Sequence, residues 1–294
     1  MKININASVG KQGANLANDV KLIQATINTY LRSTKQDCVA VDGDCGDKTI
    51  GAITAFQSKV VKLAAPDGRI DPGGTSLKKL KTTYENALKD GKPLAKPEVG
   101  IVTFDSEGME GGPYHSRILH VPGAWSGVTL GRGYDMGSKS AAKISAELVS
   151  AGISSKHSQK ISMAHGLKGV AAKQFIINND LLDFQITPLE QVKLFTISYN
   201  EESNETERIC KRSAYEKQYG TCNWDKLDPR IKEILIDLKF RGDYKPSTAK
   251  HIQEHIANND FDAFKNAMLN ASYWENVPKD RFTRRVNFLK GISN

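Results

Sequence analysis

The sequence lacks any long hydrophobic run. No apolar stretch in its 294 residues approaches the length that spans a membrane, and residues 1–8 lack the apolar segment of a secretory signal peptide. We therefore expect no membrane insertion, and synthesis in the cytoplasm. A chain of this kind would leave the cell through lysis or through a specialised secretion machine.

Cysteine is scarce, and the four cysteines form two local pairs, Cys38 with Cys45 and Cys210 with Cys222. If oxidised, each pair would close a short loop and stabilise the fold by about 2–3 kcal/mol. Such bonds would suit an oxidising periplasm. Four free thiols are the alternative, because nearness in sequence does not establish disulfide geometry.

A concentrated basic segment is also missing. The formal net charge is +8, yet the only basic cluster is residues 78–81, and no nucleic-acid-binding motif is present. Residues 1–97 hold 15 basic and 9 acidic residues, whereas residues 98–294 hold 26 and 24. The N-terminal third is therefore the basic part, which favours a polyanionic partner other than nucleic acid.

Carboxylates are absent between residues 111 and 134. The acidic residues around this gap are Glu98, Asp105, Glu107, Glu110 and Asp135. Glycosidases use two carboxyl groups, one as general acid and one to activate water or attack the sugar. If this region cleaves a glycosidic bond, one acid of the 105–110 cluster must act with Asp135. A charged loop beside a glycine hairpin is the alternative.

Residues 126–137, Ser-Gly-Val-Thr-Leu-Gly-Arg-Gly-Tyr-Asp-Met-Gly, are the most informative segment. As an extended strand they would place alternate side chains on opposite faces. One face would carry Thr129, Gly131, Gly133 and Asp135, and the other Val128, Leu130, Tyr134 and Met136. The first face combines a hydroxyl and a carboxylate with a glycine floor that a bulky ligand can approach closely. The second face can pack on a core.

Several motifs together resemble the pesticin-type muramidases, which are related to the tailed-phage lysozymes. The segments that carry the resemblance are residues 107–112, 116–122, 126–137, 189–200, 236–244 and 274–289. In that family a Glu, a Thr and an Asp form the site, with Thr and Asp six positions apart, as Thr129 and Asp135 are. The resemblance implies Glu107 as the catalytic acid, with Glu110 as the alternative. The Asp of simpler phage lysozymes precedes the Thr, and no acid stands there in this chain.

The resemblance implies hydrolysis of the β-1,4 bond between N-acetylmuramic acid and N-acetylglucosamine, without a metal or an organic cofactor. In the same region Arg117 and Arg132 are candidates for contacts to sugar or peptide, and Gly131 and Gly133 for close approach of the substrate. Trp125 is either a stacking platform for a sugar ring or an apolar plug of the hairpin.

The first ninety residues form a separate pattern. Apolar residues keep helical spacing over 16–31 and 53–63, a third helix is expected over 76–89, and a turn-rich loop lies between the first two. Residues 42–57, Asp-Gly-Asp-Cys-Gly-Asp-Lys-Thr-Ile-Gly-Ala-Ile-Thr-Ala-Phe-Gln, resemble the three-helix peptidoglycan-binding domain. The resemblance makes Asp42, Gly43 and Thr49 candidates for wall contacts. A small bundle whose glycines only turn the chain is the alternative.

One further motif would indicate a different function, that of a zinc peptidase. His251 and His255 are four residues apart with Glu254 between them, which matches an inverted zinc-peptidase pattern. Zinc would need a third protein ligand, and no partner motif follows. The flanking isoleucines favour an ordinary amphipathic helix, so we expect no metal.

The fold class that follows is mainly α (α+β). We expect a three-helix bundle at 1–90, a linker at 91–98, and a lysozyme-like lobe at 99–294 with a small β-hairpin and a helical body. The expected helix starts in this body are Thr187, Asp228, Ser247, Asp260 and Pro278.

The expected function is that of a peptidoglycan hydrolase, either a phage endolysin or a secreted antibacterial effector or bacteriocin. It would act on bacterial peptidoglycan in the periplasm or cell wall, with an immunity protein or the secretion or lysis machinery as further partners. A non-catalytic wall-binding protein, a lytic transglycosylase and a peptidase are the alternatives. The oligomeric state stays open.

Overall fold

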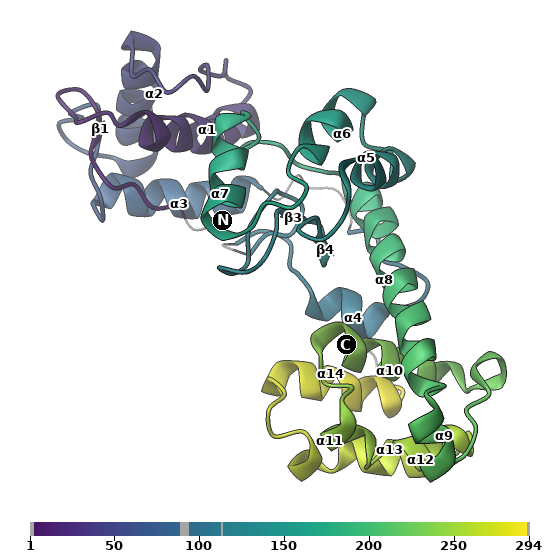
Figure 1. Cartoon of the computed structure of the whole chain (residues 1–294). Helices are drawn as coiled ribbons and strands as arrows, with labels where there is room; N and C mark the ends of the chain where they lie inside the picture. Colours follow the sequence, from purple (N-terminus) through teal and green to yellow (C-terminus); the bar gives the residue numbers. More distant parts are fainter. Residues whose placement is uncertain (1–2, 89–93, 113, 293–294) are drawn as a thin grey trace. The chain divides into compact units, whose positions relative to one another are not determined.

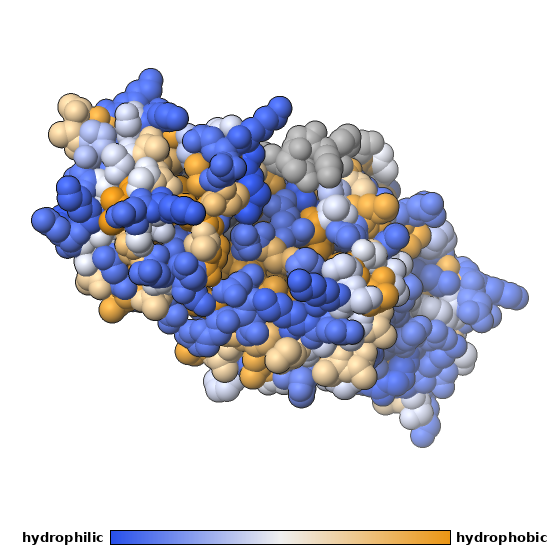
Figure 2. All heavy atoms as spheres, turned by 90° about the horizontal axis from the view of Figure 1, so that it is seen from above, coloured by the Kyte–Doolittle hydropathy of each residue, from blue (hydrophilic) through white to orange (hydrophobic). Residues whose placement is uncertain are grey.

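Helices make up most of the computed structural model, which describes residues 3–88, 94–112 and 114–292. Within these ranges there are fourteen α-helices and two small antiparallel sheets, so the expected mainly α fold class is confirmed (Figure 1). No helix in these ranges combines the length and apolar character needed to cross a membrane. On the face drawn in Figure 2, hydrophilic residues prevail, and hydrophobic residues appear in groups between them.

The chain divides into two compact units. The first unit is Met1–Ala95 with Gly108–Leu194, and the second unit is Lys96–Glu107 with Phe195–Asn294. The first unit thus joins the N-terminal bundle to half of the expected catalytic lobe. The predicted domains, 1–90 and 99–294 with a linker at 91–98, stay a prediction. Residues 91–93 of this linker lie outside the described residues.

The N-terminal bundle contains the three expected helices. They are α1 (Ala17–Ser33), α2 (Asp47–Phe56), continued by the π-helical turn η1 (Gln57–Val61), and α3 (Thr75–Ala87). Strand β1 (Val9–Gly10) pairs antiparallel with β2 (Arg69–Ile70). Ile23, Ile27, Ile53 and Phe56 are fully buried, as the helical spacing predicted.

The remainder of the first unit contains a hairpin and three short helices. Its elements are β3 (Thr129–Leu130), β4 (Tyr134–Asp135), α5 (Ala141–Ser150), α6 (Ser155–Ser162), α7 (Gly169–Asn178) and the start of α8 (Pro188–Cys210). Helix α5 packs on α6, and α7 packs on α1 of the bundle. Thr187 and Glu190 form the expected capping box at α8, with bonds of 2.7 and 3.2 Å.

The second unit is a helical body. It contains α4 (Ile101–Ser106), the rest of α8, α9 (Ser213–Tyr219), η2 (Trp224–Lys226), α10 (Pro229–Arg241), α11 (Pro246–Ala249), α12 (Gln253–Ala257), α13 (Phe261–Leu269), η3 (Ala271–Tyr273) and α14 (Lys279–Leu289). Asp228, Asp260 and Pro278 are N-caps, as expected. Ser247 is not: α11 begins at Pro246 after Lys245, because proline favours the first helical position.

Candidate active site

The glycine-rich segment folds as the expected small β-hairpin, and its two strands are shorter than the extended-strand interpretation of residues 126–137. Gly131 and Gly133 adopt φ values of 64° and 86°, which turn the chain between β3 and β4. The predicted separation of faces nevertheless holds. Thr129 pairs directly with Asp135, and Leu130 pairs with Tyr134, and directly paired residues share a face. The hydroxyl and the carboxylate are therefore neighbours across the hairpin.

Two backbone N–H groups fix the carboxylate of Asp135. Gly137 N donates to Oδ1 at 2.6 Å, and Gly127 N donates to Oδ2 at 3.1 Å. Gly127 must be glycine, because a Cβ there would lie 2.5 Å from Asp135 Oδ1 and 2.3 Å from Gly137 N. The side chain of Asp135 is thus held in one orientation while staying partly exposed to solvent.

Thr129 is anchored by its own backbone. Its N–H donates to His120 O at 2.8 Å, and its carbonyl accepts from His120 N at 3.0 Å. The Thr129 side chain is almost fully buried, and its hydroxyl lies 3.4 Å from Gly127 O. Burial lowers the pKa of His120, so this imidazole stays neutral beside Thr129 near pH 7.

The loop that precedes β3 carries an exposed aromatic ring. Trp125 is 89 % exposed, which overturns the interpretation of this residue as a hairpin plug. Gly169 N donates to Ser126 O at 3.0 Å, so the start of α7 ties the loop down. A Cβ on Gly169 would lie 2.4 Å from Ala124 O. One fixed loop therefore presents an indole ring and, at Gly127, an N–H that holds Asp135.

Glu110 is enclosed by partners in the first unit. Arg117 Nε donates to Oε2 at 2.8 Å, and Gln191 Nε2 donates to Oε1 at 3.0 Å. Gln191 Oε1 in turn accepts from the hydroxyl of Ser116 at 2.7 Å. Both oxygens of Glu110 are therefore engaged in a structural network. Sequence analysis missed Gln191, which lies 81 positions away on α8.

Arg117 and Arg132 are buried, contrary to their prediction as substrate contacts. Arg117 is 1 % exposed and also donates to Ile186 O at 2.8 Å, and Arg132 is 3 % exposed and donates to Gly108 O at 2.7 Å. Their guanidinium groups hold loops together and do not face solvent. Gly131 is buried in the turn, whereas Gly133 is partly exposed and stays a candidate for substrate approach.

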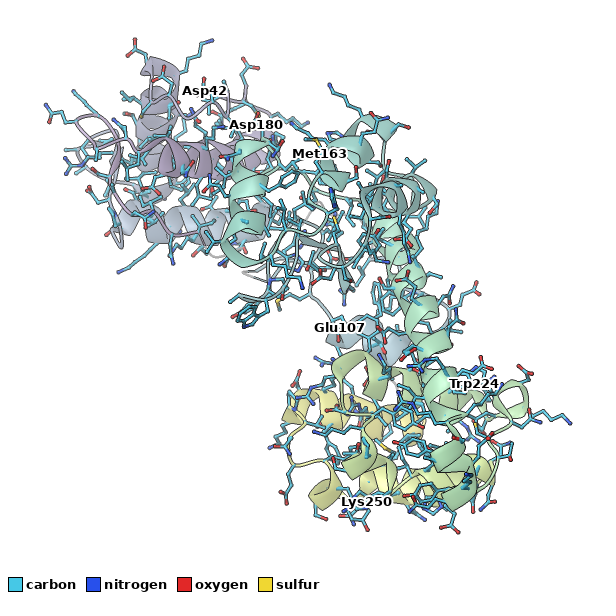
Figure 3. The ribbon with its side chains drawn as sticks, viewed as in Figure 1. Asp42, Glu107, Met163, Asp180, Trp224 and Lys250 are labelled. Atoms are coloured by element: carbon cyan, nitrogen blue, oxygen red, sulfur yellow. The ribbon has the colours of Figure 1, made fainter. Side chains whose placement is uncertain are left out.

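Glu107 belongs to the second unit, directly after α4 (Figure 3). Arg281 Nη1 from α14 donates to its Oε1 at 2.5 Å. Arg281 Nη2 also donates to Asp237 Oδ1 at 2.6 Å, and Arg285 Nε donates to Asp237 Oδ2 at 2.6 Å. Asp237 and Arg285 are fully buried. A buried ion network thus orients the predicted catalytic acid.

The charges of this network stabilise one another. Burial alone would raise the pKa of Asp237, but the guanidinium groups of Arg285 and Arg281 lower it below its usual value. The pKa of Arg281 is raised, because Asp237 and Glu107 together outweigh the effect of burial. The sequence places Arg281 and Arg285 on one face of a helix. It does not predict Asp237 as their partner, because 44 residues separate Asp237 from Arg281.

Another buried carboxylate fixes the start of α4. Glu233 from α10 accepts from Gly100 N at 2.7 Å and from Val102 N at 3.1 Å. These are N–H groups that a helix start leaves without partners. Burial raises the pKa of Glu233. Helix α4 is therefore tied to α10 at its start and, through Glu107, to α14 at its end.

The two candidate acids differ in how many of their carboxylate oxygens accept hydrogen bonds. Among the described residues, Glu107 Oε2 has no hydrogen-bond partner, whereas both oxygens of Glu110 are occupied. A general acid must present a proton to the leaving group. The local geometry therefore favours Glu107 over Glu110.

The candidate wall-binding residues form a latch in the bundle. Gln24 Nε2 donates to Asp42 Oδ1 at 2.9 Å and to Thr49 Oγ1 at 3.1 Å, and Gln24 Oε1 accepts from Gly43 N at 3.0 Å. Hydrogen bonds from Asp44 N and Gln24 lower the pKa of Asp42. Thr49 is 3 % exposed, so its predicted wall contact is not supported, whereas Asp42 is exposed at the loop and Gly43 is half-buried.

A second latch repeats the first. Gln57 Nε2 donates to Asp67 Oδ1 at 2.6 Å and to Ser76 Oγ at 3.2 Å, and Gln57 Oε1 accepts from Gly68 N at 2.8 Å. Each latch therefore joins a Gln, an Asp-Gly turn and a hydroxyl near the start of the next helix. The repeated Asp-Gly pair is the sequence signal that would have revealed it.

Neither histidine of the zinc-like motif belongs to a metal-binding cluster. Within the described ranges no three His, Cys, Asp or Glu side chains are placed to hold a metal ion. His251 instead stacks on Tyr273, with ring centroids 3.8 Å apart and planes at 9°.

A model of one protein family matches most of the chain beyond the bundle. The family is described as a domain of unknown function, DUF8812, and the match covers residues 100–286. Because this is more than half of the chain, the protein belongs to the DUF8812 family. No curated protein matches the chain. The matched region contains Glu107, Thr129, Asp135 and Arg281.

Proposed function

We propose that this DUF8812 protein is a peptidoglycan hydrolase that cleaves the β-1,4 bond between N-acetylmuramic acid and N-acetylglucosamine. The observation that carries the proposal is the pairing of Thr129 with Asp135 across a glycine-turned hairpin, with the carboxylate of Asp135 fixed by two backbone N–H groups. This arrangement supplies a fixed, partly exposed anion beside a hydroxyl, which is what the activation of a water molecule requires.

The proposed reaction is a direct displacement. Asp135 removes a proton from water while the water oxygen bonds to the anomeric carbon, and Glu107 gives its proton to the leaving sugar oxygen. The hydroxyl of Thr129 would orient the water, because a neutral hydroxyl is too weak a base to act alone. Arg281 holds one oxygen of Glu107 and leaves Oε2 for the proton.

The N-terminal bundle is proposed to bind the wall. Its excess of basic residues suits an anionic envelope, and the exposed Asp42 and the half-buried Gly43 lie in the loop of the first latch. The protein would act in the periplasm or cell wall, as an endolysin or as a secreted antibacterial effector. Release machinery or an immunity protein would be its partners.

The test is mass spectrometry of fragments released from purified sacculi. We expect reducing muramic ends from the wild-type protein and from Glu110→Gln, and no release by Glu107→Gln or Asp135→Asn. Circular dichroism of each variant checks that the fold is retained. Loss of activity only in Glu110→Gln would move the acid to that residue and leave the function intact.

The other outcomes separate the alternatives. Anhydro-muramic ends that persist in Asp135→Asn would indicate a lytic transglycosylase, which needs one catalytic acid. Cleaved peptides would indicate a peptidase. Binding to sacculi without release of fragments would leave only a wall-binding protein.

A further inference from the structure

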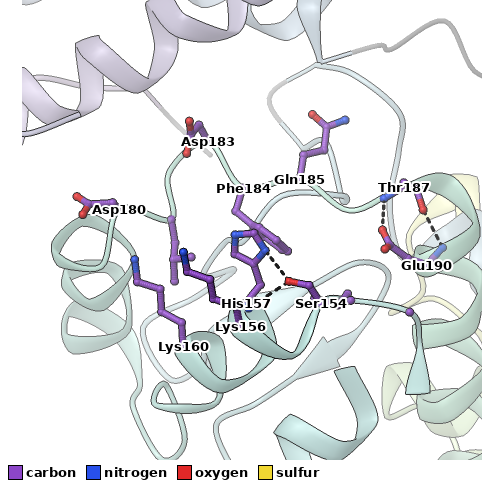
Figure 4. Close-up of a pocket in the computed structure, with 13 residues that line it drawn as sticks. Ser154, Lys156, His157, Lys160, Asp180, Asp183, Phe184, Gln185, Thr187 and Glu190 are labelled. Atoms are coloured by element: carbon purple, nitrogen blue, oxygen red, sulfur yellow. Dashed lines mark hydrogen bonds between the residues drawn. The ribbon is translucent and has the colours of Figure 1, made fainter. Parts of the chain in front are cut away.

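A pocket of about 610 Å³ lies in the first unit between α6 and residues 180–190 (Figure 4). Its lining includes none of the residues assigned to the reaction, so the proposed function does not account for it. Side chains of α6 form one wall, and the loop that leads into α8 forms the other.

The α6 wall carries two lysines without ion-pair partners. Lys156 and Lys160 are one helical turn apart, and both extend toward the opposite wall (Figure 4). Within the described part of the chain neither ammonium group has a carboxylate partner. Like charges at this spacing repel each other. An anion bound between them would relieve that repulsion.

Two of the three acidic residues that line the pocket form ion pairs with helix α1. Lys21 of α1 lies 3.3 Å from Asp180 Oδ1, and Arg32 of α1 lies 3.2 Å from Asp183 Oδ2. These pairs reduce the repulsion that Asp180 and Asp183 would exert on an anionic ligand. Glu190, the third carboxylate of the lining, accepts a hydrogen bond from Thr187 N at 2.7 Å. With the two cations of α1 counted, four basic side chains lie among three acidic ones, so the pocket keeps a net positive charge that can hold an anion.

An apolar surface lies beside the lysines. The ring of His157 lies 4.9 Å from the ring of Phe184 at a tilt of 49°, and His157 Nδ1 is 3.0 Å from Ser154 Oγ. Ile153 and Leu181, which are 4 % and 2 % exposed, complete this surface. The space suits a small alkyl group next to the anionic group.

We propose that this pocket binds a peptide carboxylate, with the anion at Lys156 and Lys160 and a small alkyl side chain against His157 and Phe184. The inference rests on the proposed function, because the stem peptides of peptidoglycan combine free carboxylates with alanine methyl groups. The pocket would then recognise cross-linkable peptides while the hairpin acts on the glycan.

The direct test is isothermal titration of the full chain with a synthetic stem tetrapeptide, Ala-Glu-diaminopimelate-Ala. Substitution of both lysines, Lys156→Gln with Lys160→Gln, should weaken binding about tenfold or more, because two charge-assisted contacts are lost. Lys173→Gln is the matched control, since it removes an exposed lysine of α7 outside the pocket. A tetrapeptide with amidated carboxylates should not bind.

Three results would overturn the proposal: no binding by the wild-type protein, equal binding by the double variant, or displacement of the peptide by equimolar inorganic phosphate. The last would make the pocket a general anion site. Peptide binding that the double variant loses would support the pocket even if sacculi are never cleaved. Cleavage of sacculi without peptide binding would support only the hydrolase.

Discussion

Arg281 and Glu107 are 174 positions apart in the sequence and are joined by a hydrogen bond of 2.5 Å. Because the same guanidinium group binds the buried Asp237, the orientation of Glu107 depends on the helical body that holds Arg281. The tertiary fold of the second unit therefore sets the orientation of the predicted acid, which directly follows the six-residue helix α4.

Replacement of this arginine should cost both stability and activity. Arg281→Gln leaves Asp237 with one guanidinium partner, so we expect a loss of about 3 kcal/mol in the free energy of unfolding, measured by urea denaturation. The control is Arg284→Gln, three residues further along α14. It breaks a surface ion pair with Asp280 and should lower the free energy of unfolding by about 0.5 kcal/mol or less. Equal losses in the two variants would contradict the role given to the network.

A methyl group at Gly127 should disable Asp135. In Gly127→Ala the new Cβ meets Gly137 N and Asp135 Oδ1, so the carboxylate must move. We expect about 1–3 kcal/mol of destabilisation from overpacking and a fall of about 100-fold in the rate of sacculus hydrolysis. Gly123→Ala is the control in the same loop, because its Cβ has only an ordinary contact of 3.6 Å with Ser126 Oγ. A fully active Gly127→Ala protein would refute the role of the fixed carboxylate.

Removal of the exposed indole should weaken substrate binding without loss of stability. We expect Trp125→Ala to raise KM for solubilised glycan about three- to tenfold, which corresponds to the usual energy of one ring contact. The melting temperature should stay unchanged, since Trp125 is 89 % exposed. Trp125→Tyr should restore most of the affinity. If KM is the same in all three proteins, Trp125 is not a sugar platform.

Acidification should destabilise the hairpin through His120. Burial lowers the pKa of His120 below 6.5 in the folded protein, so the unfolded chain takes up the proton first as the pH falls. This contribution to stability is fully present above pH 6.5 and is lost as the pH falls through the folded-state pKa, with a slope of at most about 1.4 kcal/mol per pH unit. Urea midpoints between pH 7 and pH 5 measure it.

The same series with two variants isolates the effect. His120→Gln should lack this acid-dependent loss, whereas His165→Gln, which changes an exposed histidine, should retain it. A slope that persists unchanged in His120→Gln would assign the acid sensitivity to other groups.

One pair of cysteines should form a disulfide on oxidation. The thiols of Cys210 and Cys222 are both buried, and the interaction with Cys222 is the main cause that lowers the pKa of Cys210 to about 7. All four cysteines are free in the structure. Oxidised glutathione should take two electrons and two protons from this pair, giving two reduced glutathiones and a cross-link.

Peptide mass spectrometry would identify the bond, and thermal unfolding should show a stabilisation of about 2–3 kcal/mol. Cys38 is exposed and contacts Asn28 O and Arg32 instead of Cys45, so we expect no cross-link there. Preferential oxidation of Cys38 with Cys45 would contradict this assignment.

Much of the local structure could be predicted from the sequence, because its causes are local. Apolar spacing placed α1 and α2, and the Thr187–Glu190 and Asp228 caps marked helix starts that the structure confirms. The two faces of the hairpin also followed from the alternation of side chains. The position of the glycine turn did not follow, since the same alternation describes one long strand and two paired short ones.

The interior of the candidate site could not be predicted, because its contacts join distant segments. Arg117 and Arg132 were expected at the surface, as charged residues usually are, but Glu110 and backbone carbonyls satisfy them inside. The role of Asp237 as counter-ion appears only when α10 and α14 pack together.

The uneven exposure of the tryptophans provides an optical probe. Trp224 and Trp274 are 7 % and 3 % exposed, whereas Trp125 is open to solvent. An aqueous quencher such as iodide should therefore extinguish the emission of Trp125 and spare the other two. Because the loop of Trp125 also holds Asp135 through Gly127, protection from iodide would report on occupation of the hairpin in the unlabelled protein.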